Sequence, residues 1–169
     1  HDGETGWSSE TFLVRHHPPL RLSIAGHGGS VEALVRLAGA MGVACEVASP
    51  DAALVARFAE LNIQANHLQR LSQPLPSQPD RWTALVCYFH DHDWEASLLM
   101  QALSSSAFYI GAMGSRSTHA ARLDSLGKMG AKEQDLERIA APIGLIPSSR
   151  DPDTLALSTL AQVVDCYNR

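Results

Sequence analysis

The sequence predicts an α/β protein of the Rossmann-like kind, a three-layer domain in which helices cover a mainly parallel sheet. Short apolar runs alternate with segments whose apolar residues recur at helical spacing. Two of the apolar runs close on glycine-rich loops that lead directly into a helix. Because right-handed crossovers bring the carboxyl ends of parallel strands to one edge, we expect a ligand to bind at that edge.

The first half of the chain contains two strand–helix units. An apolar run over 21–25 closes on the first glycine loop, Gly26-His27-Gly28-Gly29-Ser30, and Ser30 is the expected N-cap of the helix that follows and ends at Gly42. A second strand is expected over 44–48 and a second helix over 52–61. Prolines make residues 62–80 mostly loop, with a short strand near 66–68.

The second half repeats this alternation. The apolar run 84–89 ends in His90-Asp91-His92-Asp93, and a helix is expected from 94 to 103. A strand over 107–110 closes on the second glycine loop, residues 111–118, which leads into a helix that stops at Gly127. The last helix has Asp151 as its N-cap and Pro152 at its first helical position.

Length and composition fit one core of a soluble protein. The chain has 169 residues, and we divide it into a lead-in strand and linker over 1–20, from a trimmed upstream region, and a Rossmann-like domain over 21–169. The net charge of -5 argues against a nucleic-acid surface. No apolar run approaches the roughly 20 residues of a membrane span. Three widely spaced cysteines, Cys45, Cys87 and Cys166, argue against disulfides and favour the cytoplasm.

The first glycine loop is a candidate phosphate site. Gly26, Gly28 and Gly29 follow a strand and precede a helix, where glycine permits a tight turn and lets the backbone approach a phosphate. The third glycine of the dinucleotide pattern is replaced by Val31, and Ser49 stands where an acid would bind the ribose. NAD(P) is therefore less favoured as a ligand, and a turn that merely needs glycine remains an alternative.

The second glycine loop is the stronger candidate. It combines glycines with three hydroxyls and a guanidinium at the start of a helix, which suits an oxyanion or a phosphate. A helix cap rich in small polar residues is the alternative interpretation. The candidate binding residues here are Gly111, Gly114, Ser115, Arg116, Thr118 and His119.

A histidine cluster follows the strand at 84–89. His90 and His92 would point to one side if the strand continued, as a metal pair with Asp91 or Asp93 in support. No third ligand is identifiable from spacing, so we expect no metal site, and we treat His90, Asp91 and His92 as pocket-lining residues. The three cysteines are expected to be small core residues and not catalytic thiolates.

These motifs together resemble the XdhC/CoxI family of accessory factors for molybdenum hydroxylases such as xanthine dehydrogenase. The most specific part is the run Phe108-Tyr109-Ile110-Gly111-Ala112-Met113-Gly114-Ser115-Arg116-Ser117-Thr118-His119. Further similarity lies in Glu10-Thr11-Phe12, Pro18-Pro19-Leu20-Arg21-Leu22, His90-Asp91-His92, Ile139, Ala141-Pro142-Ile143-Gly144-Leu145, Leu155-Ala156-Leu157-Ser158 and Leu160-Ala161.

The resemblance implies a chaperone more than a catalyst, and no catalytic residue is assigned. Family members bind molybdenum cofactor, a molybdopterin with or without a nucleotide extension, protect it while a cysteine desulfurase adds the terminal sulfide, and deliver it to the apo-hydroxylase. The partners implied are therefore an apo molybdenum hydroxylase and a cysteine desulfurase, and a homodimer stays open. An NAD(P)-dependent oxidoreductase and a cofactor-free scaffold are the alternatives.

The chain departs from the family pattern in the first loop. Gly26-His27-Gly28-Gly29 stands where the family has Gly-Ala-Gly-His, and Ser49 stands where an acidic residue ends the second strand. The cysteine-containing amino-terminal domain of the family is also missing from this sequence. Cofactor binding is therefore expected to depend mainly on the second glycine loop.

Overall fold

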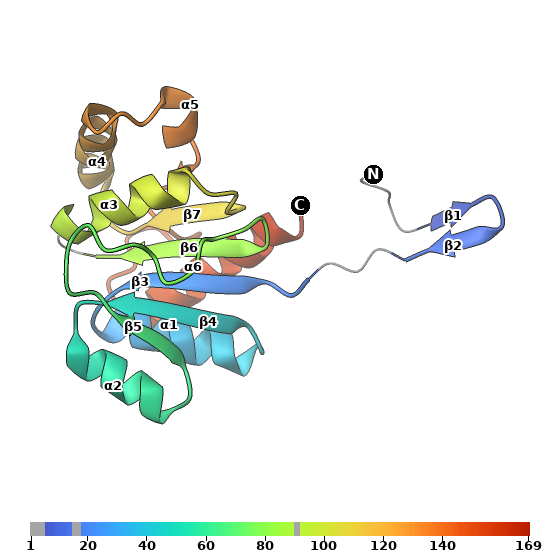
Figure 1. Ribbon diagram of the computed structural model, residues 1–169, viewed down its shortest axis with the longest axis horizontal. Coiled ribbons are helices and arrows are strands. Elements are labelled where there is room, and N and C mark those ends of the chain that lie inside the picture. Colours follow the sequence, from blue (N-terminus) through green and yellow to red (C-terminus); the bar gives the residue numbers. More distant parts are fainter. Residues whose placement is uncertain (1–5, 15–17, 90–91) are drawn as a thin grey trace.

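The structure is a computed structural model that describes residues 6–14, 18–89 and 92–169 (Figure 1). Its centre is a six-stranded sheet with the strand order β5-β4-β3-β6-β7-β8, and every pairing in it is parallel. The strands are β3 (Arg21–Gly26), β4 (Ala44–Ser49), β5 (Gln64–His67), β6 (Thr83–Tyr88), β7 (Tyr109–Ala112) and β8 (Ile139–Ala140). The order reverses between β3 and β6, which is the topological switch point of a Rossmann sheet.

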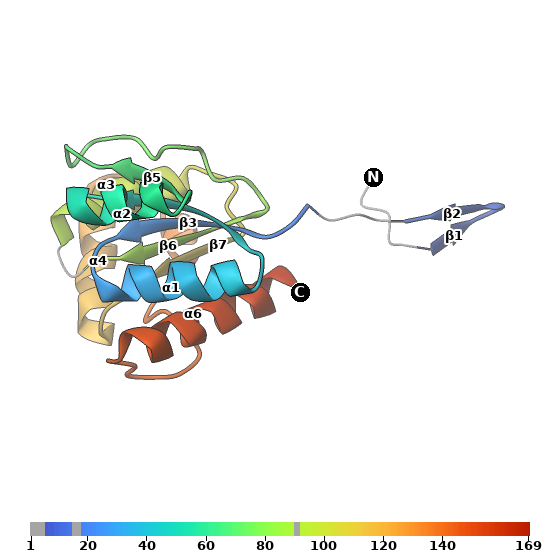
Figure 2. The same cartoon turned by 90° about the horizontal axis from the view of Figure 1, so that it is seen from below.

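Helices cover both faces of this sheet and complete the predicted three layers. Figure 2 shows α1 and α6 side by side on one face, and α3 lies on the other. The helices are α1 (Gly29–Ala40), α2 (Ala52–Glu60), α3 (His92–Leu103), α4 (Arg116–Lys128), α5 (Glu133–Leu136) and α6 (Pro152–Tyr167). Two clusters of buried apolar side chains, one for each face, hold the layers together.

Strand β6 lies at the centre of the sheet and is buried on both of its faces. All six of its residues are buried, as expected for a parallel strand covered by helices on each side. Tyr88 points toward α6, where its hydroxyl donates to Thr159 Oγ1 at 2.6 Å. Leu85 and Cys87 belong to the opposite cluster, with the apolar side chains of α3.

None of the described helices is long and apolar enough to cross a bilayer.

The segment before the domain forms a hairpin. Antiparallel strands β1 (Gly6–Ser8) and β2 (Thr11–Leu13) pair there, and the rings of Trp7 and Phe12 lie 5.2 Å apart. A single strand and a linker were expected in this region, so the second strand is a finding of the structure. The hairpin stands apart from the sheet and its helices in both views (Figures 1 and 2).

Of the two N-caps that the sequence predicts, Asp151 is confirmed and Ser30 is not. Asp151 accepts from the backbone of Thr154 at 2.8 Å, and Pro152 opens α6 as expected. The N-cap of α1, however, is Gly28 with no side-chain cap, and Ser30 lies inside the helix. The Ser30 prediction was wrong because the helix begins two residues earlier than assumed, so that the backbone N–H of Val31 already donates to the Gly28 carbonyl at 3.1 Å.

Candidate functional site at the carboxyl edge of the sheet

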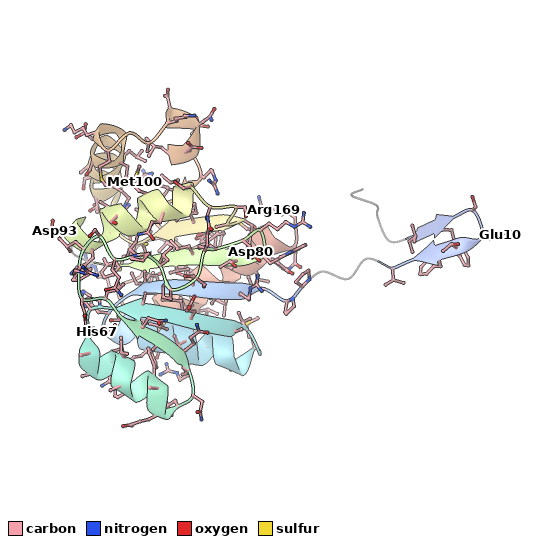
Figure 3. The ribbon with its side chains drawn as sticks, in the orientation of Figure 1. Glu10, His67, Asp80, Asp93, Met100 and Arg169 are labelled. Atoms are coloured by element: carbon pink, nitrogen blue, oxygen red, sulfur yellow. The ribbon has the colours of Figure 1, made fainter. Side chains whose placement is uncertain are left out.

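The loops predicted to bind a ligand meet at one end of the sheet. Figure 3 shows His67 and Asp93 at this carboxyl end, with Asp80 and Arg169 at the opposite end. Helices α1, α4 and α6 all begin here. Gly29 lies against Pro152, since a Cβ on Gly29 would come 3.7 Å from Pro152 Cγ. The amino termini of α1 and α6 are therefore adjacent, at the switch point where Rossmann sheets bind ligands.

The first glycine loop has one glycine required for packing and one required for conformation. Gly26 is buried against β6, and a Cβ there would stand 2.6 Å from the carbonyl oxygen of Tyr88. Gly28 has a φ of +79°, a conformation that favours glycine, and a Cβ on it would meet no atom within 4 Å. The half-buried ring of His27 packs edge-on against Phe89, 5.9 Å between centroids, and so joins the loops after β3 and β6.

The residues that weaken a dinucleotide pattern are built into the fold. Val31 is fully buried in the core between α1 and the sheet. The buried Ser49 hydroxyl accepts from the backbone of Asp51 at 3.1 Å. Asp51 in turn caps α2 by accepting from the amides of Ala53 and Leu54, each at 3.0 Å. The carboxylate nearest the end of β4 is therefore engaged in a helix cap.

The second glycine loop presents a cluster of hydroxyls at the start of α4. Ser115 is the N-cap, and its Oγ accepts from the backbone of Thr118 at 3.1 Å. The same Oγ lies 2.7 Å from Ser117 Oγ and 2.9 Å from Thr118 Oγ1. Arg116 is exposed beside them. The structure thus brings together three hydroxyls, a guanidinium and the free amides of a helix start.

The two glycines of this second loop have different roles. Gly111 was expected in the loop, but it lies inside β7, where a Cβ would stand 2.5 Å from Ile143 Cδ1 and 2.6 Å from Tyr109 Cε1. Its predicted position in the loop was therefore wrong, and the structure gives it a packing role, while its contact with a ligand stays a prediction. Gly114 does lie in the loop, exposed and with a φ of +130°, and a Cβ on it would stand 2.7 Å from Thr118 Cγ2.

The predicted histidine cluster falls largely outside the described residues. His90 and Asp91 are among the residues for which no placement is described. Strand β6 ends at Tyr88, and His92 is the first residue of α3, so His92 does not continue that strand. Among the described residues no three His, Cys, Asp or Glu side chains gather as a metal site. The role of His90, Asp91 and His92 as pocket-lining residues stays a prediction.

Sequence reasoning missed a buried ion pair behind the second glycine loop. Arg122 Nη2 lies 2.9 Å from Glu95 Oε1, and the side chains are 2% and 3% exposed. His119, predicted as a binding residue, is half-buried with its Nδ1 3.4 Å from Arg122 Nη1. Burial, and then the charge of Arg122, lower the pKa of His119 below its ordinary value. Nothing in the local sequence distinguishes Arg122 from an ordinary exposed helix arginine.

The cysteines behave as small packing residues. All three are free thiols; Cys87 is buried in β6, and Cys45 and Cys166 are half-buried beside the core. Burial raises the pKa of Cys45 to about 11 and raises that of Cys87 as well. A thiolate is therefore disfavoured at either position at neutral pH.

The loop between β8 and α6 is fastened to α6. The backbone of Gly144 donates to Gln162 Oε1 at 2.7 Å, and the backbone of Ile146 donates to Ser158 Oγ, also at 2.7 Å. Gly144 has a φ of +98°, and a Cβ on it would stand 2.4 Å from Ser158 Oγ. This part of the family-like sequence pattern therefore fixes the loop between β8 and α6 against α6.

A parallel sheet with glycine-led helices at its switch point defines a Rossmann-type binding domain. The match to known proteins is more specific. The model of the XdhC Rossmann domain matches residues 22–163, and the chain belongs to this family.

Two comparisons with individual proteins agree with this assignment. The chain is 33% identical over 159 residues to the molybdenum cofactor insertion chaperone PaoD of Escherichia coli, covering 94% of this chain and 44% of PaoD. A crystal structure described as a xanthine dehydrogenase from Bacillus halodurans superposes with a TM-score of 0.73 at 20% identity, covering 89% of this chain and 43% of that one. The latter shows the shared fold. The chain thus spans less than half the length of either relative.

Proposed function

We propose that this chain binds molybdenum cofactor at the carboxyl edge of its sheet and takes part in delivering it to a molybdenum hydroxylase of the xanthine dehydrogenase type. The observation that carries the proposal is the 33% identity to a molybdenum cofactor insertion chaperone across 94% of this chain. The cofactor is cargo in this role, so the chain needs to hold and release it but not to transform it.

The donors at the site suit the phosphate that the cofactor carries. The first turns of α1 and α4 provide backbone N–H groups without partners in their own helices, and the helix dipoles add positive potential there. Arg116 adds a charge, and Ser115, Ser117 and Thr118 add hydroxyls. Gly28 offers open space for the approach of a ligand to the backbone.

We assign the phosphate to the second glycine loop, with the first loop as a second wall. Gly114, Ser115, Arg116 and Thr118 would hold the phosphate. Gly28 and Gly29 would border the remainder of the ligand, together with His90, Asp91, His92 and His119. Gly26 shapes the turn through its contact with Tyr88 and makes no ligand contact in this proposal.

The partners in this proposal follow from the cargo. A chaperone that shields the cofactor before insertion has to meet the apo-hydroxylase, and sulfuration before insertion requires a cysteine desulfurase. The chain has a net charge of -5, and α6 begins with Asp151 as its N-cap and Asp153 in its first turn. Positive charge near the site is therefore limited, and Arg116 supplies one such charge at the start of α4. This favours a small anionic cargo over a polyanion such as nucleic acid.

The test is whether the protein carries the pterin. The chain is purified from a host that makes molybdenum cofactor, and the released, oxidised pterin is measured by its fluorescence. We expect pterin in the wild-type preparation and none in a preparation from a host that cannot make the cofactor. A wild-type preparation without pterin, which also fails to bind added cofactor, would contradict the proposal.

A further inference from the structure

A buried guanidinium lies directly behind the second glycine loop. The ion pair of Glu95 and Arg122 joins α3 to α4, and both side chains are almost fully buried. Removing two charges from water is costly and offsets much of their mutual attraction, so such a pair is a weak source of stability. A cavity of about 190 Å³ borders the pair and is lined otherwise by Ala96, Ala121, Ser125 and Leu126. The position of this charge therefore calls for a role other than stabilising the core.

Arg122 holds the loop that precedes its own helix. Its Nη2 donates to the carbonyl oxygen of Met113 at 2.6 Å. The backbone N–H of Met113 donates to the carbonyl oxygen of Cys87 at 3.0 Å. Met113 is thus fixed at both of its backbone groups, by β6 on one side and by α4 on the other. A Cβ on Gly114 would lie 3.4 Å from Arg122 Nη2, so the guanidinium also limits the space beside the next residue.

This contact sets the direction of the Gly114 amide. A trans peptide is planar, so its C=O and the N–H of the next residue point in opposite directions. With the Met113 oxygen turned toward the buried Arg122, the N–H of Gly114 is turned away from it. Gly114 is exposed, and its N–H has no hydrogen-bond partner among the described residues. The result is a backbone donor presented outward beside the hydroxyl of Ser115.

The same guanidinium also contacts His119. Nη1 lies 3.4 Å from His119 Nδ1, one turn into α4, and the positive charge contributes to the lowered pKa of that imidazole. One buried arginine therefore contacts the loop before α4 and the first turns of α4. Glu95, in the first turn of α3, supplies the opposite charge that lets this arginine of α4 remain buried.

We propose that Arg122 is a positioning residue for the ligand: with Glu95 as its counter-charge, it holds the Met113 carbonyl so that the Gly114 amide and the first turn of α4 face the phosphate. This inference rests on the proposed function for the identity of the ligand. The orientation of the loop in the ligand-free protein does not depend on it, and the two can be tested separately.

The test removes both charges together and keeps the packing volume. In the double variant Glu95→Gln with Arg122→Met, no buried charge is left unpaired, which is the condition under which such replacements are tolerated. The matched control is Asp124→Asn with Lys128→Met, an ion pair on the exposed side of the same helix. A second variant, Arg122→Lys, keeps the charge but loses the planar fork that binds two acceptors at once.

Two measurements are made on each variant, with thermal melts run alongside. Titration with molybdenum cofactor should show binding weaker by about tenfold or more for the double variant and for Arg122→Lys, and unchanged for the control. Hydrogen exchange of the Met113 amide in the ligand-free protein should accelerate in the same two variants only. Should the double variant fail to fold, Arg122→Lys carries both measurements.

The outcomes separate the two proposals. Wild-type affinity together with wild-type exchange at Met113 in a folded variant would overturn the positioning role. Wild-type protein that does not bind molybdenum cofactor would contradict the proposed function, and the exchange of the Met113 amide would still decide whether Arg122 orients the loop. A change in melting temperature alone, with affinity and exchange unaltered, would show a purely structural ion pair and also overturn the inference.

Discussion

Gly26 and Tyr88 approach so closely at the switch point that a Cβ on Gly26 would stand 2.6 Å from the carbonyl oxygen of Tyr88 and 2.8 Å from its Cβ. These residues are paired in the register of β3 and β6, the two strands between which the chain order reverses. The close pairing of β3 and β6 at the carboxyl edge of the sheet therefore depends on a backbone contact that only glycine permits at this position.

This contact predicts a large difference between two glycine substitutions. Gly26→Ala forces an added methyl into the backbone of β6, and we expect the free energy of unfolding to fall by about 2 kcal/mol or more. Gly39 lies exposed in α1, where a Cβ meets no atom within 4 Å. Gly39→Ala should stabilise by about 0.5 to 1 kcal/mol, because alanine favours the helix. Urea denaturation of both variants checks this, and equal stabilities would refute the packing argument.

A second pair of variants separates backbone strain from crowding. Gly114 and Gly130 both have positive φ, +130° and +97°, but only a Cβ on Gly114 meets a neighbour, Thr118 Cγ2 at 2.7 Å. Gly130→Ala should cost about 1 kcal/mol from conformation alone. Gly114→Ala should cost about 1 to 3 kcal/mol more through crowding, and should weaken ligand binding. If Gly114→Ala lowers the denaturation midpoint no more than Gly130→Ala does, the side chain of Thr118 moves aside at no cost in stability.

Nicotinamide dinucleotides should bind weakly or not at all. Val31 fills the position of the third glycine with a buried side chain, and Ser49 and Asp51 are engaged with one another and with the cap of α2. The carboxylate of Asp51, nearest the end of β4, already accepts two amides in the cap of α2, and Ser49 stands where an acid would accept from a ribose. Calorimetric titration with NAD and with NADP should detect no tight binding. A micromolar dissociation constant for either cofactor would show that this interpretation of the first loop is wrong.

His119 should titrate below the ordinary value of 6.5 in the native protein, because burial and then the charge of Arg122 disfavour its protonated form. The unfolded chain takes up a proton before the folded chain does, so this contribution to stability is present above about pH 6.5 and is lost as the pH falls. An NMR titration of the imidazole measures the pKa directly. In the double variant Glu95→Gln with Arg122→Met the pKa should rise but stay lowered by burial. Because Glu95 acts in the opposite direction, a pKa unaltered by that variant would exclude a net effect of the Glu95–Arg122 pair.

The fold was predictable because each of its layers repeats a local pattern. Apolar runs such as 84–89 and glycine-led helix starts recur in order, and their alternation fixes a parallel sheet. The Asp151 cap was predictable because an acidic residue directly before a proline is typical of the N-cap and first position of a helix. Gly111 was misplaced because a glycine required by a distant side chain, Ile143, has the same appearance in the sequence as a glycine required by a turn.

The ion pair of Glu95 and Arg122 could not be predicted for a related reason. The partners are 27 positions apart on different helices, and each falls in a helix that also carries exposed charges. Helical spacing alone gives a charged residue no sign that tertiary packing will bury it. The hydroxyls at 115–118 were predictable, since the grouping of short polar side chains at a helix start is a local feature.

Direct binding to the second glycine loop is the central claim, and one titration tests it. Molybdenum cofactor is titrated into the wild type, into Arg116→Ala, and into Arg81→Ala, which removes the same charge next to Trp82, just before β6 begins at the other end of the sheet. We predict that Arg116→Ala weakens binding by about 1.5 to 3 kcal/mol, the range of a charge-assisted contact, with no change in melting temperature. Arg81→Ala should bind as the wild type does. Equal affinity of all three proteins would contradict the account and move the phosphate to the first loop, at Gly28.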